Sequence, residues 1–391
     1  MSALQAAPGV LLRGDDAIDA LAARFGAGAR VLVVHGPVGF PAVRERLAAA
    51  LERVGAVAVA GLHEGPCCAA AIDAHAAAAE RERVDWVLGV GGGRVIDAAK
   101  GAAQRTRTRF AALPTSPATC AATAPTVVLY DDHGAHVEAL EGGISAAACA
   151  LDPALLATAP DRLLVAGVLD AWAKVHEVRL TAAGLATVGG TTRAALALVD
   201  DLAALLREHT AAALAAGPGG ARDGALLARR RLVAEAVVVY PGLIGGLAGA
   251  DAKLALAHPL HDALTHLPGA HAALHGEKVA FGTLVQLRVA GHGGASAGAD
   301  AVPDADDADR LRAMRDEAAL YAGLGARLDL ASLGCGEARG GEALAFVVRR
   351  TVEDDPVRLA LPWLDADTLR AAILEVDDWL RGGAAQRGAA T

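Results

Sequence analysis

Short apolar runs alternate with Ala-rich stretches of helical spacing over residues 8 to about 158, and this alternation constrains the fold most. The apolar runs cover residues 30–34, 57–59, 84–90 and 110–113, and the helical stretches cover residues 42–54, 68–83 and 95–105. Alternation of strands and helices produces a parallel sheet with helices on both faces. The sequence therefore predicts an N-terminal α/β domain.

The pattern changes at about residue 159. Apolar residues then recur at helical spacing in residues 163–180, 193–207, 226–240, 253–265, 276–289, 308–324 and 366–380. Few alternating runs typical of strands remain there. This predicts an all-α C-terminal domain over residues 159–391. A Gly-, Ala- and Asp-rich segment over residues 291–309 is expected to be an exposed loop.

A glycine-rich loop, Gly89-Val-Gly-Gly-Gly93, follows a predicted strand and opens a predicted helix. Glycines let the backbone approach a pyrophosphate, and the helix N-terminus adds free N–H groups and a positive dipole end. Asp97 and Lys100 follow on the same helix. A glycine turn without a ligand is the alternative, but this context favours phosphate binding. We therefore expect residues 1–158 to bind a dinucleotide, although the spacing is not that of an ordinary Rossmann dehydrogenase.

Composition excludes several classes of partner. The formal net charge of −9 disfavours nucleic acids and anionic membrane surfaces. No uninterrupted apolar run of about 18 residues or more predicts a membrane span, and the N-terminus lacks the features of a signal peptide. The five cysteines form no CxxC pair, which suits free thiols in a reducing cytoplasm. We expect a cytoplasmic protein.

Histidines are concentrated around a break at Leu267-Pro-Gly269 between two predicted helices. His258 and His275 are candidate metal ligands, because a buried helix has little use for several imidazoles that bind nothing. Asp170, in an apolar helical stretch, is the best-placed carboxylate to complete a three-ligand site. His261, one turn after His258, is a candidate fourth ligand or substrate-facing group. Any single histidine here could instead be a hydrogen-bonded core residue.

Lysine is rare, because the chain has only Lys100, Lys174, Lys253 and Lys278, while arginine supplies the other cations. Three of these lysines lie in the segments that carry the proposed chemistry. A compact ammonium group is not interchangeable with a planar guanidinium group, so these lysines are expected to have specific roles.

Five segments together carry a resemblance to a known family. These segments are Gly91–Lys100, Leu113–Cys120, Ala166–Asp170, His258–His261 and His275–Gly282. The chain resembles the iron-containing (group III) alcohol dehydrogenases, near the glycerol dehydrogenase branch. The resemblance implies a fold like that of dehydroquinate synthase and glycerol dehydrogenase, a small-molecule substrate and a homo-oligomer. It also implies one Zn²⁺ or Fe²⁺ held by Asp170, His258 and His275.

The resemblance further implies NAD(H) or NADP(H) on the glycine loop. The expected cofactor-binding residues are Gly36, Gly91, Gly92, Gly93, Asp97, Lys100, Thr115, Thr119, Val127 and Tyr130. NAD-specific members often place an acid where this chain has His35-Gly-Pro37. No carboxylate rejects a 2′-phosphate there, although no obvious Lys or Arg receives it. We therefore expect NADPH to be accepted.

Departures from the family pattern concern the substrate. Cys120 replaces an Asp that helps glycerol dehydrogenases to bind the polyol, and the sequences around Cys120 and Asp170 look closer to the bacterial hydroxycarboxylate dehydrogenase branch. Lys174 stands where four-ligand members have a histidine. A lysine on the helix face of Asp170 could meet a substrate carboxylate; an ion pair with Asp170 or another acid is the alternative.

The expected reaction is reversible hydride transfer between a nicotinamide and a small alcohol or 2-hydroxy acid, with the metal as Lewis acid. His261 is a candidate route for the proton, so His261 and Lys174 are the candidate catalytic residues. The main alternative is a sugar-phosphate cyclase, a lyase with a similar fold, metal and cofactor. Those cyclases have Ala at the position of Lys278 and use several cations for the substrate phosphate. A non-catalytic metal or nucleotide binder is a third possibility.

Overall fold

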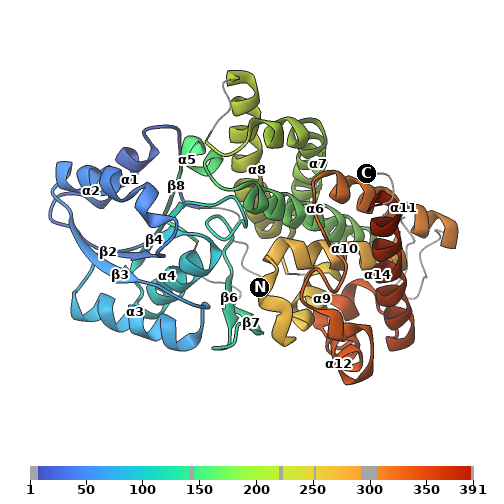
Figure 1. Ribbon diagram of the computed structural model, residues 1–391. Coiled ribbons are helices and arrows are strands. Elements are labelled where there is room, and N and C mark those ends of the chain that lie inside the picture. Colours follow the sequence, from blue (N-terminus) through green and yellow to red (C-terminus); the bar gives the residue numbers. More distant parts are fainter. Residues whose placement is uncertain (1–7, 141–144, 220–222, 251, 292–305, 389–391) are drawn as a thin grey trace. The chain divides into compact units, whose positions relative to one another are not determined.

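The computed structural model describes residues 8–140, 145–219, 223–250, 252–291 and 306–388. The chain divides into two compact units, which are described separately (Figure 1). Unit 1 comprises Met1–Val168 and Ala204–Gly246, and unit 2 comprises Leu169–Ala203 and Leu247–Thr391.

Unit 1 contains a six-stranded parallel sheet in the order β1-β8-β5-β4-β2-β3. Its strands are β1 (Leu11–Arg13), β2 (Arg30–His35), β3 (Val57–Leu62), β4 (Trp86–Gly91), β5 (Arg109–Pro114) and β8 (Ala148–Leu151). A separate antiparallel hairpin joins β6 (Val127–Tyr130) to β7 (His136–Leu140). The predicted parallel sheet is confirmed, and every residue of β4 is buried, as expected for a central parallel strand.

Helices cover both faces of this sheet. Figure 1 shows α1 (Ala17–Phe25) and α2 (Arg44–Arg53) on one face, with α3 (Ala69–Arg81) and α4 (Gly93–Thr106) on the other. Ile18 and Leu47 pack with Trp86 in the core beneath α1 and α2. A short helix, α5 (Pro153–Ala157), follows β8, and Asp152 caps it by accepting from the N–H of Leu155.

All regular elements described after Leu151 are helices, which confirms the predicted all-α C-terminal region. The longer ones are α6 (Asp161–Gly184), α7 (Gly190–Ala216), α8 (Gly224–Ala248), α9 (Ala257–Leu264), α10 (His275–Ala290), α11 (Asp307–Gly323), α12 (Gly341–Val352), α13 (Asp355–Ala360) and α14 (Ala366–Gly388). Most of the predicted loop over residues 291–309 lies outside the described residues, and α11 begins within its last part. The two compact units divide within α6, α7 and α8. The predicted domain boundary near residue 158 stays a prediction.

Helix α8 is long and apolar enough to cross a membrane by length and composition alone. However, 61% of its most apolar window is buried inside the protein. Its Arg230 is fully buried and donates to the carbonyl oxygens of Ala157 at 2.8 Å and Ala159 at 2.6 Å. These contacts suit a helix that packs in the interior of the protein, because a buried guanidinium group needs hydrogen-bond acceptors.

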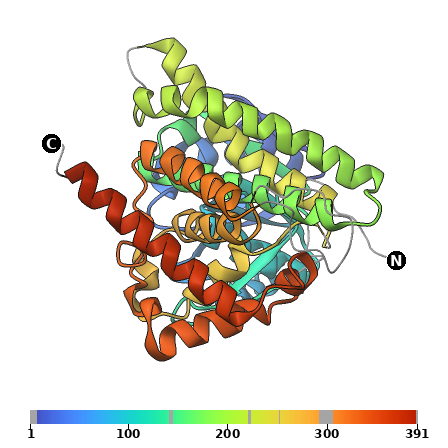
Figure 2. The ribbon, with the colours of Figure 1, turned by 90° about the vertical axis from the view of Figure 1, so that its right-hand side faces the viewer.

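Unit 2 is built around α10, nearly all of whose side chains are buried. Helices α9, α11 and α14 pack on it, and Figure 2 shows α14 (red) crossing in front. Ala173 of α6, Ala257 of α9 and Val279 of α10 form one small buried cluster. Small side chains let these three helices approach closely, and the same helices carry the three predicted metal ligands.

The close approach of α9 and α10 depends on Gly282. A Cβ added there would lie 2.4 Å from the Ala257 carbonyl oxygen and 2.9 Å from its Cα. We expect Gly282→Ala to lower the free energy of unfolding by about 1–3 kcal/mol through overpacking, measured by urea denaturation. Gly245 of α8 is the matched control, since nothing lies within 4 Å of its added Cβ. Gly245→Ala should be neutral or stabilising; equal losses in both variants would contradict the packing argument.

Candidate metal and nucleotide sites

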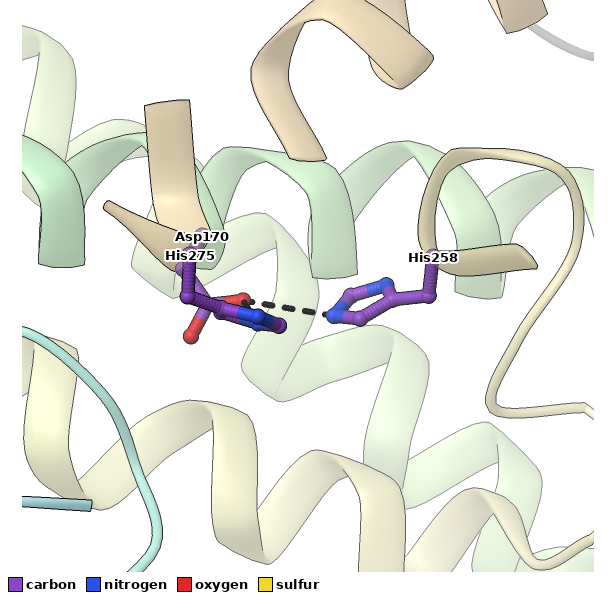
Figure 3. A group of neighbouring side chains, drawn as sticks. All are labelled: Asp170, His258 and His275. Atoms are coloured by element: carbon purple, nitrogen blue, oxygen red, sulfur yellow. Dashed lines mark ion pairs between the residues drawn. The ribbon is translucent and has the colours of Figure 1, made fainter. Parts of the chain in front are cut away.

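Asp170, His258 and His275 converge in unit 2, each from a different helix (Figure 3). The Nε2 atom of His258 lies 3.3 Å from Asp170 Oδ1, and Nε2 of His275 lies 3.5 Å from the same oxygen. One ligand atom from each residue lies within 4.8 Å of the others. Two imidazoles and one carboxylate fit a divalent cation such as Zn²⁺ or Fe²⁺, and three protein ligands leave a position for substrate.

Local contacts fix the start of α10 and therefore His275, its first residue. The Glu277 carboxylate accepts from the backbone N–H of Leu274 at 2.7 Å. Lys278 Nζ donates to the carbonyl oxygens of Ala270 at 3.0 Å and Ala273 at 2.8 Å, in and after the short 3₁₀-helix Pro268–Ala272. Thus Glu277 caps the start of α10, and Lys278 connects the segment around the Pro-Gly break to this helix. These two contacts give Glu277 and Lys278 a structural role directly after His275.

A carboxylate not predicted from the sequence supports His258. Glu177 of α6 is 0% exposed, and its Oε2 lies 2.6 Å from Nδ1 of His258. Its Oε1 accepts from the backbone N–H groups of Ala255 and His258, both at 3.1 Å. The available signal was an acidic residue seven positions, or two helical turns, after Asp170 in an apolar stretch.

Lys174 does not occupy the substrate-facing position predicted for it. Its side chain is buried, its Nζ donates to the Lys253 carbonyl oxygen at 2.7 Å, and it lies 3.6 Å from Glu177 Oε2. The structure therefore favours the alternative ion pair, with Glu177 as the partner instead of Asp170. The physical reason is that a buried carboxylate such as Glu177 needs a compensating charge.

His261 lies directly behind His275. Its Nε2 lies 3.0 Å from His275 Nδ1, and its own Nδ1 lies 2.8 Å from Asp262 Oδ1. Both ring nitrogens thus have protein neighbours, and the ring is almost completely buried. This placement does not support a fourth metal ligand or a substrate contact, and it makes His261 a neighbour that orients the His275 ring.

The charges of the site are strongly coupled. Burial raises the pKa of Asp170, but His275 and His258 outweigh it and hold that pKa well below its usual range. Burial likewise opposes ionisation of Glu177, yet His258 and Lys174 lower its pKa to about 2. Burial disfavours the His258 cation, but Glu177 and Asp170 raise the pKa of His258 to about 9. A positive charge between the two carboxylates is therefore favoured, and a metal ion would replace the proton.

The glycine loop of unit 1 is shaped for an anion. Gly92 is the N-cap of α4, no side chain caps this helix, and the space where a Gly92 Cβ would stand is open to 4 Å. A Cβ on Gly91 would lie 2.8 Å from Val95, and one on Gly93 would lie 2.9 Å from Thr119 Oγ1. A larger residue at Gly91 would therefore clash with Val95, and the first N–H groups of α4 can face a pyrophosphate.

Asp97 and Lys100, which were predicted to contact the cofactor, contact each other and the backbone of a neighbouring loop instead. Lys100 is 0% exposed, and its Nζ lies 3.1 Å from Asp97 Oδ1. It also donates to the carbonyl oxygens of Ala121, Ala124 and Thr126, at 2.8, 2.9 and 2.7 Å. Full burial excludes a direct contact between Lys100 and a cofactor, so this pair instead ties the loop before β6 to α4.

Three of the remaining residues predicted in unit 1 lie close to the glycine loop. A Cβ on Gly36 would meet Val95 at 3.1 Å, and the Thr115 N–H donates to the Gly91 carbonyl oxygen at 3.0 Å. Gly36, Thr115 and Thr119 therefore lie around the glycine loop, and their role in binding the cofactor stays a prediction.

Val127 does not face the loop. Its side chain packs in a buried cluster with Cys67, Ile72, Ala98 and Leu129. Tyr130, the last residue of β6, packs against the same cluster, but its side chain is only half-buried and stays partly accessible. Cys120, the predicted substrate residue, is half-buried in a turn where its carbonyl oxygen accepts from the Thr123 and Ala124 N–H groups.

Comparison with known proteins identifies relatives along most of the chain. Residues 8–153 match the family described as iron-containing alcohol dehydrogenase. Hydroxycarboxylate dehydrogenase A of Escherichia coli is 31% identical over 264 residues, covering 67% of this chain and 70% of that protein. An uncharacterized oxidoreductase of Synechocystis is 39% identical over 209 residues, and an Escherichia coli glycerol dehydrogenase is 35% identical over 226 residues. The matches to these two cover 54% and 57% of this chain but only 52% and 59% of the relatives.

Solved structures match over nearly the full length. A probable glycerol dehydrogenase from Sinorhizobium meliloti has a TM-score of 0.76 at 26% identity, covering 97% of this chain and 99% of that chain. Glycerol dehydrogenase from Schizosaccharomyces pombe also has a TM-score of 0.76, at 21% identity, covering 99% of this chain and 94% of that chain. The predicted glycerol dehydrogenase-like fold is thereby confirmed.

Proposed function

Since the chain belongs to the iron-containing alcohol dehydrogenases, we propose that it is a metal-dependent, NAD(P)-linked oxidoreductase. It interconverts a small alcohol or 2-hydroxy acid and its carbonyl compound by hydride transfer. The observation that carries this proposal is the convergence of Asp170, His258 and His275 on one point. The uncapped glycine loop supports it, because it offers N–H groups to a dinucleotide.

The side chains of the metal site have distinct tasks in this reaction. When bound, a divalent cation would polarise the substrate oxygen, and the nicotinamide would exchange a hydride with the adjacent carbon. Asp170 supplies the negative charge at the site, and the Nε2 atoms of His258 and His275 face it. Glu177 and His261 hold these two imidazoles from behind through their Nδ1 atoms.

The proposed substrate class is a 2-hydroxy acid and its 2-oxo acid. One relative is named hydroxycarboxylate dehydrogenase A, and Cys120 provides no carboxylate for a polyol at the position where glycerol dehydrogenases have one. Lys278, the departure from the cyclase pattern, donates to two backbone carbonyl oxygens. It is therefore engaged inside unit 2 and does not act as a cation for a substrate phosphate.

The deciding experiment is a steady-state assay of the purified chain loaded with Zn²⁺ or Fe²⁺. A panel of 2-oxo acids, aldehydes and polyols would be tested with NADH and NADPH, with and without a chelator. We expect chelator-sensitive oxidation of the reduced cofactor, fastest with a 2-oxo acid and with NADPH accepted. A cyclase returns its hydride, so release of phosphate from a sugar phosphate without net cofactor oxidation would contradict the proposal.

We further infer that the protein is a cytoplasmic homo-oligomer. The family resemblance supports the oligomer, and the free cysteines support a reducing compartment. Light scattering after size-exclusion chromatography checks the first inference, and cell fractionation checks the second.

Metal affinity should fall as the pH decreases. Without metal, His258 carries a proton below its raised pKa of about 9, whereas Asp170 and Glu177 remain ionised. A metal ion must displace that proton, so we expect about a tenfold loss of Zn²⁺ affinity per pH unit below this value. Chelator competition between about pH 6.5 and pH 8.5 measures the slope. The control variant His271→Gln removes an exposed imidazole of the nearby turn and should show the same pH dependence of Zn²⁺ affinity as the wild type. A Zn²⁺ affinity of the wild type that does not change with pH would contradict the assignment of His258 as a ligand.

A further inference from the structure

Two charged side chains lie behind His258, on the ring edge opposite the one that faces Asp170. Glu177 contacts Nδ1 of His258, while Asp170 faces Nε2. We propose that Glu177, with Lys174 as its counter-ion, is the positioning residue that holds His258 in the metal-binding orientation. The proposal rests on the proposed function only in taking Asp170, His258 and His275 as metal ligands.

The hydrogen bond to Glu177 determines which nitrogen of His258 can bind a cation. A neutral imidazole has one N–H group and one lone pair. Because ionised Glu177 can only accept, the N–H group belongs on Nδ1, at 2.6 Å, and the lone pair is left on Nε2. Nε2 is the atom that lies 3.3 Å from Asp170. Glu177 therefore selects the tautomer that the site needs.

Glu177 also fixes the backbone that carries His258. Its second oxygen accepts from the N–H groups of Ala255 and His258, both at 3.1 Å, where α9 begins. One side chain of α6 thus sets the position of the first turn of α9 and the orientation of its imidazole. Since α6 also carries Asp170, the two ligands are placed relative to each other before a metal binds.

Lys174 makes this arrangement possible. A carboxylate that is 0% exposed would be strongly destabilised without a nearby positive charge. Lys174 Nζ lies 3.6 Å from Glu177 Oε2, one turn earlier on α6, and it donates to the Lys253 carbonyl oxygen at 2.7 Å. It therefore neutralises Glu177 and ties the segment before α9 to α6. This assigns Lys174 a positioning role in place of the predicted substrate contact.

The first test is the isosteric substitution Glu177→Gln, with Zn²⁺ affinity measured by competition with a chromogenic chelator. We expect the affinity to fall about 10- to 100-fold, while the dissociation constant of NADPH stays unchanged. Glu45→Gln, an exposed position on α2, is the matched control and should bind Zn²⁺ like the wild type. Wild-type Zn²⁺ affinity in Glu177→Gln would overturn the proposal.

The second test separates positioning from substrate contact. Lys174→Met should lower Zn²⁺ affinity and thermal stability, and KM for a 2-oxo acid should be unchanged at saturating Zn²⁺. A raised KM with unchanged Zn²⁺ affinity would restore the substrate contact and overturn the inference. If Lys174→Met unfolds, the double variant Lys174→Met/Glu177→Gln removes both charges and should regain a higher Tm. A double variant that is no more stable than Lys174→Met would contradict the role of Lys174 as the counter-ion of Glu177.

These measurements distinguish the inference from the proposed function. Zn²⁺ affinity and Tm are read without turnover, so they remain informative if no dehydrogenase substrate is found. A wild-type chain without dehydrogenase activity, whose Glu177→Gln variant still loses Zn²⁺ affinity, would refute the reaction and keep the positioning role. An active wild type whose Glu177→Gln variant retains full Zn²⁺ affinity would support the reaction and refute the positioning role of Glu177.

Discussion

Asp170→Asn should lose the metal and, with it, at least about 10³-fold in kcat/KM, because a Lewis acid contributes several kcal/mol to stabilising the transition state. Asp170 is the one carboxylate of the converging set, and its Oδ1 lies 3.3 and 3.5 Å from the two imidazole nitrogens. The amide keeps the shape but removes the charge that attracts a divalent cation. Metal content of the purified variant and steady-state kinetics with the best 2-oxo acid measure both effects.

Asp200→Asn is the matched control for this substitution. Asp200 lies on α7 of the same unit, but it is exposed and pairs with Arg179. Exposed ion pairs contribute little, so this variant should keep its metal and its activity. Asp170→Asn that retains stoichiometric Zn²⁺ and near-normal kcat/KM would show that the metal is held elsewhere.

Lys100→Met should destabilise unit 1 by about 3–5 kcal/mol, because it leaves a buried carboxylate and several backbone acceptors without their cation. Lys100 Nζ contacts Asp97 and three carbonyl oxygens between Ala121 and Thr126. The loop that it holds includes Thr119, next to the glycine turn. Urea unfolding measures the loss of stability, and fluorescence titration should show weaker NADPH binding as well.

The control for Lys100→Met is Arg44→Met, which removes an exposed cation from α2 and should change stability by less than about 0.5 kcal/mol. A double variant, Lys100→Met/Asp97→Asn, removes the uncompensated carboxylate and should recover part of the loss. Stability equal to the wild type in Lys100→Met alone would mean that the buried ammonium group is not what holds the loop.

The three candidate metal ligands could be identified from the sequence because their chemistry is specific. Two histidines and one aspartate in apolar helical stretches have few uses other than metal binding, and the structure brings Asp170, His258 and His275 together. The main strands and helices could also be predicted, since their periodicity extends over many residues. Strands of three to five residues, such as β1 and β8, are too short for a periodic signal to appear.

The roles of the neighbouring charged residues could not be predicted from the sequence. A motif shows that Lys174 or Lys100 lies near a site, but one helical turn decides whether its side chain faces the ligand or the interior. Both lysines turn inward, to Glu177 and Asp97. Glu177 was missed for the same reason: only the three-dimensional contact with His258 Nδ1 distinguishes it from other acids of the chain.

The buried lysines give the protein a built-in reporter of its own unfolding. Lys100, Lys174 and Lys278 all direct their ammonium groups at backbone carbonyl oxygens inside the protein. Amine-directed reagents should therefore modify these three positions slowly in the native state and rapidly once the chain opens. With so few primary amines in the sequence, mass spectrometry of labelled peptides could follow the opening of each unit separately, Lys100 for one and Lys174 with Lys278 for the other.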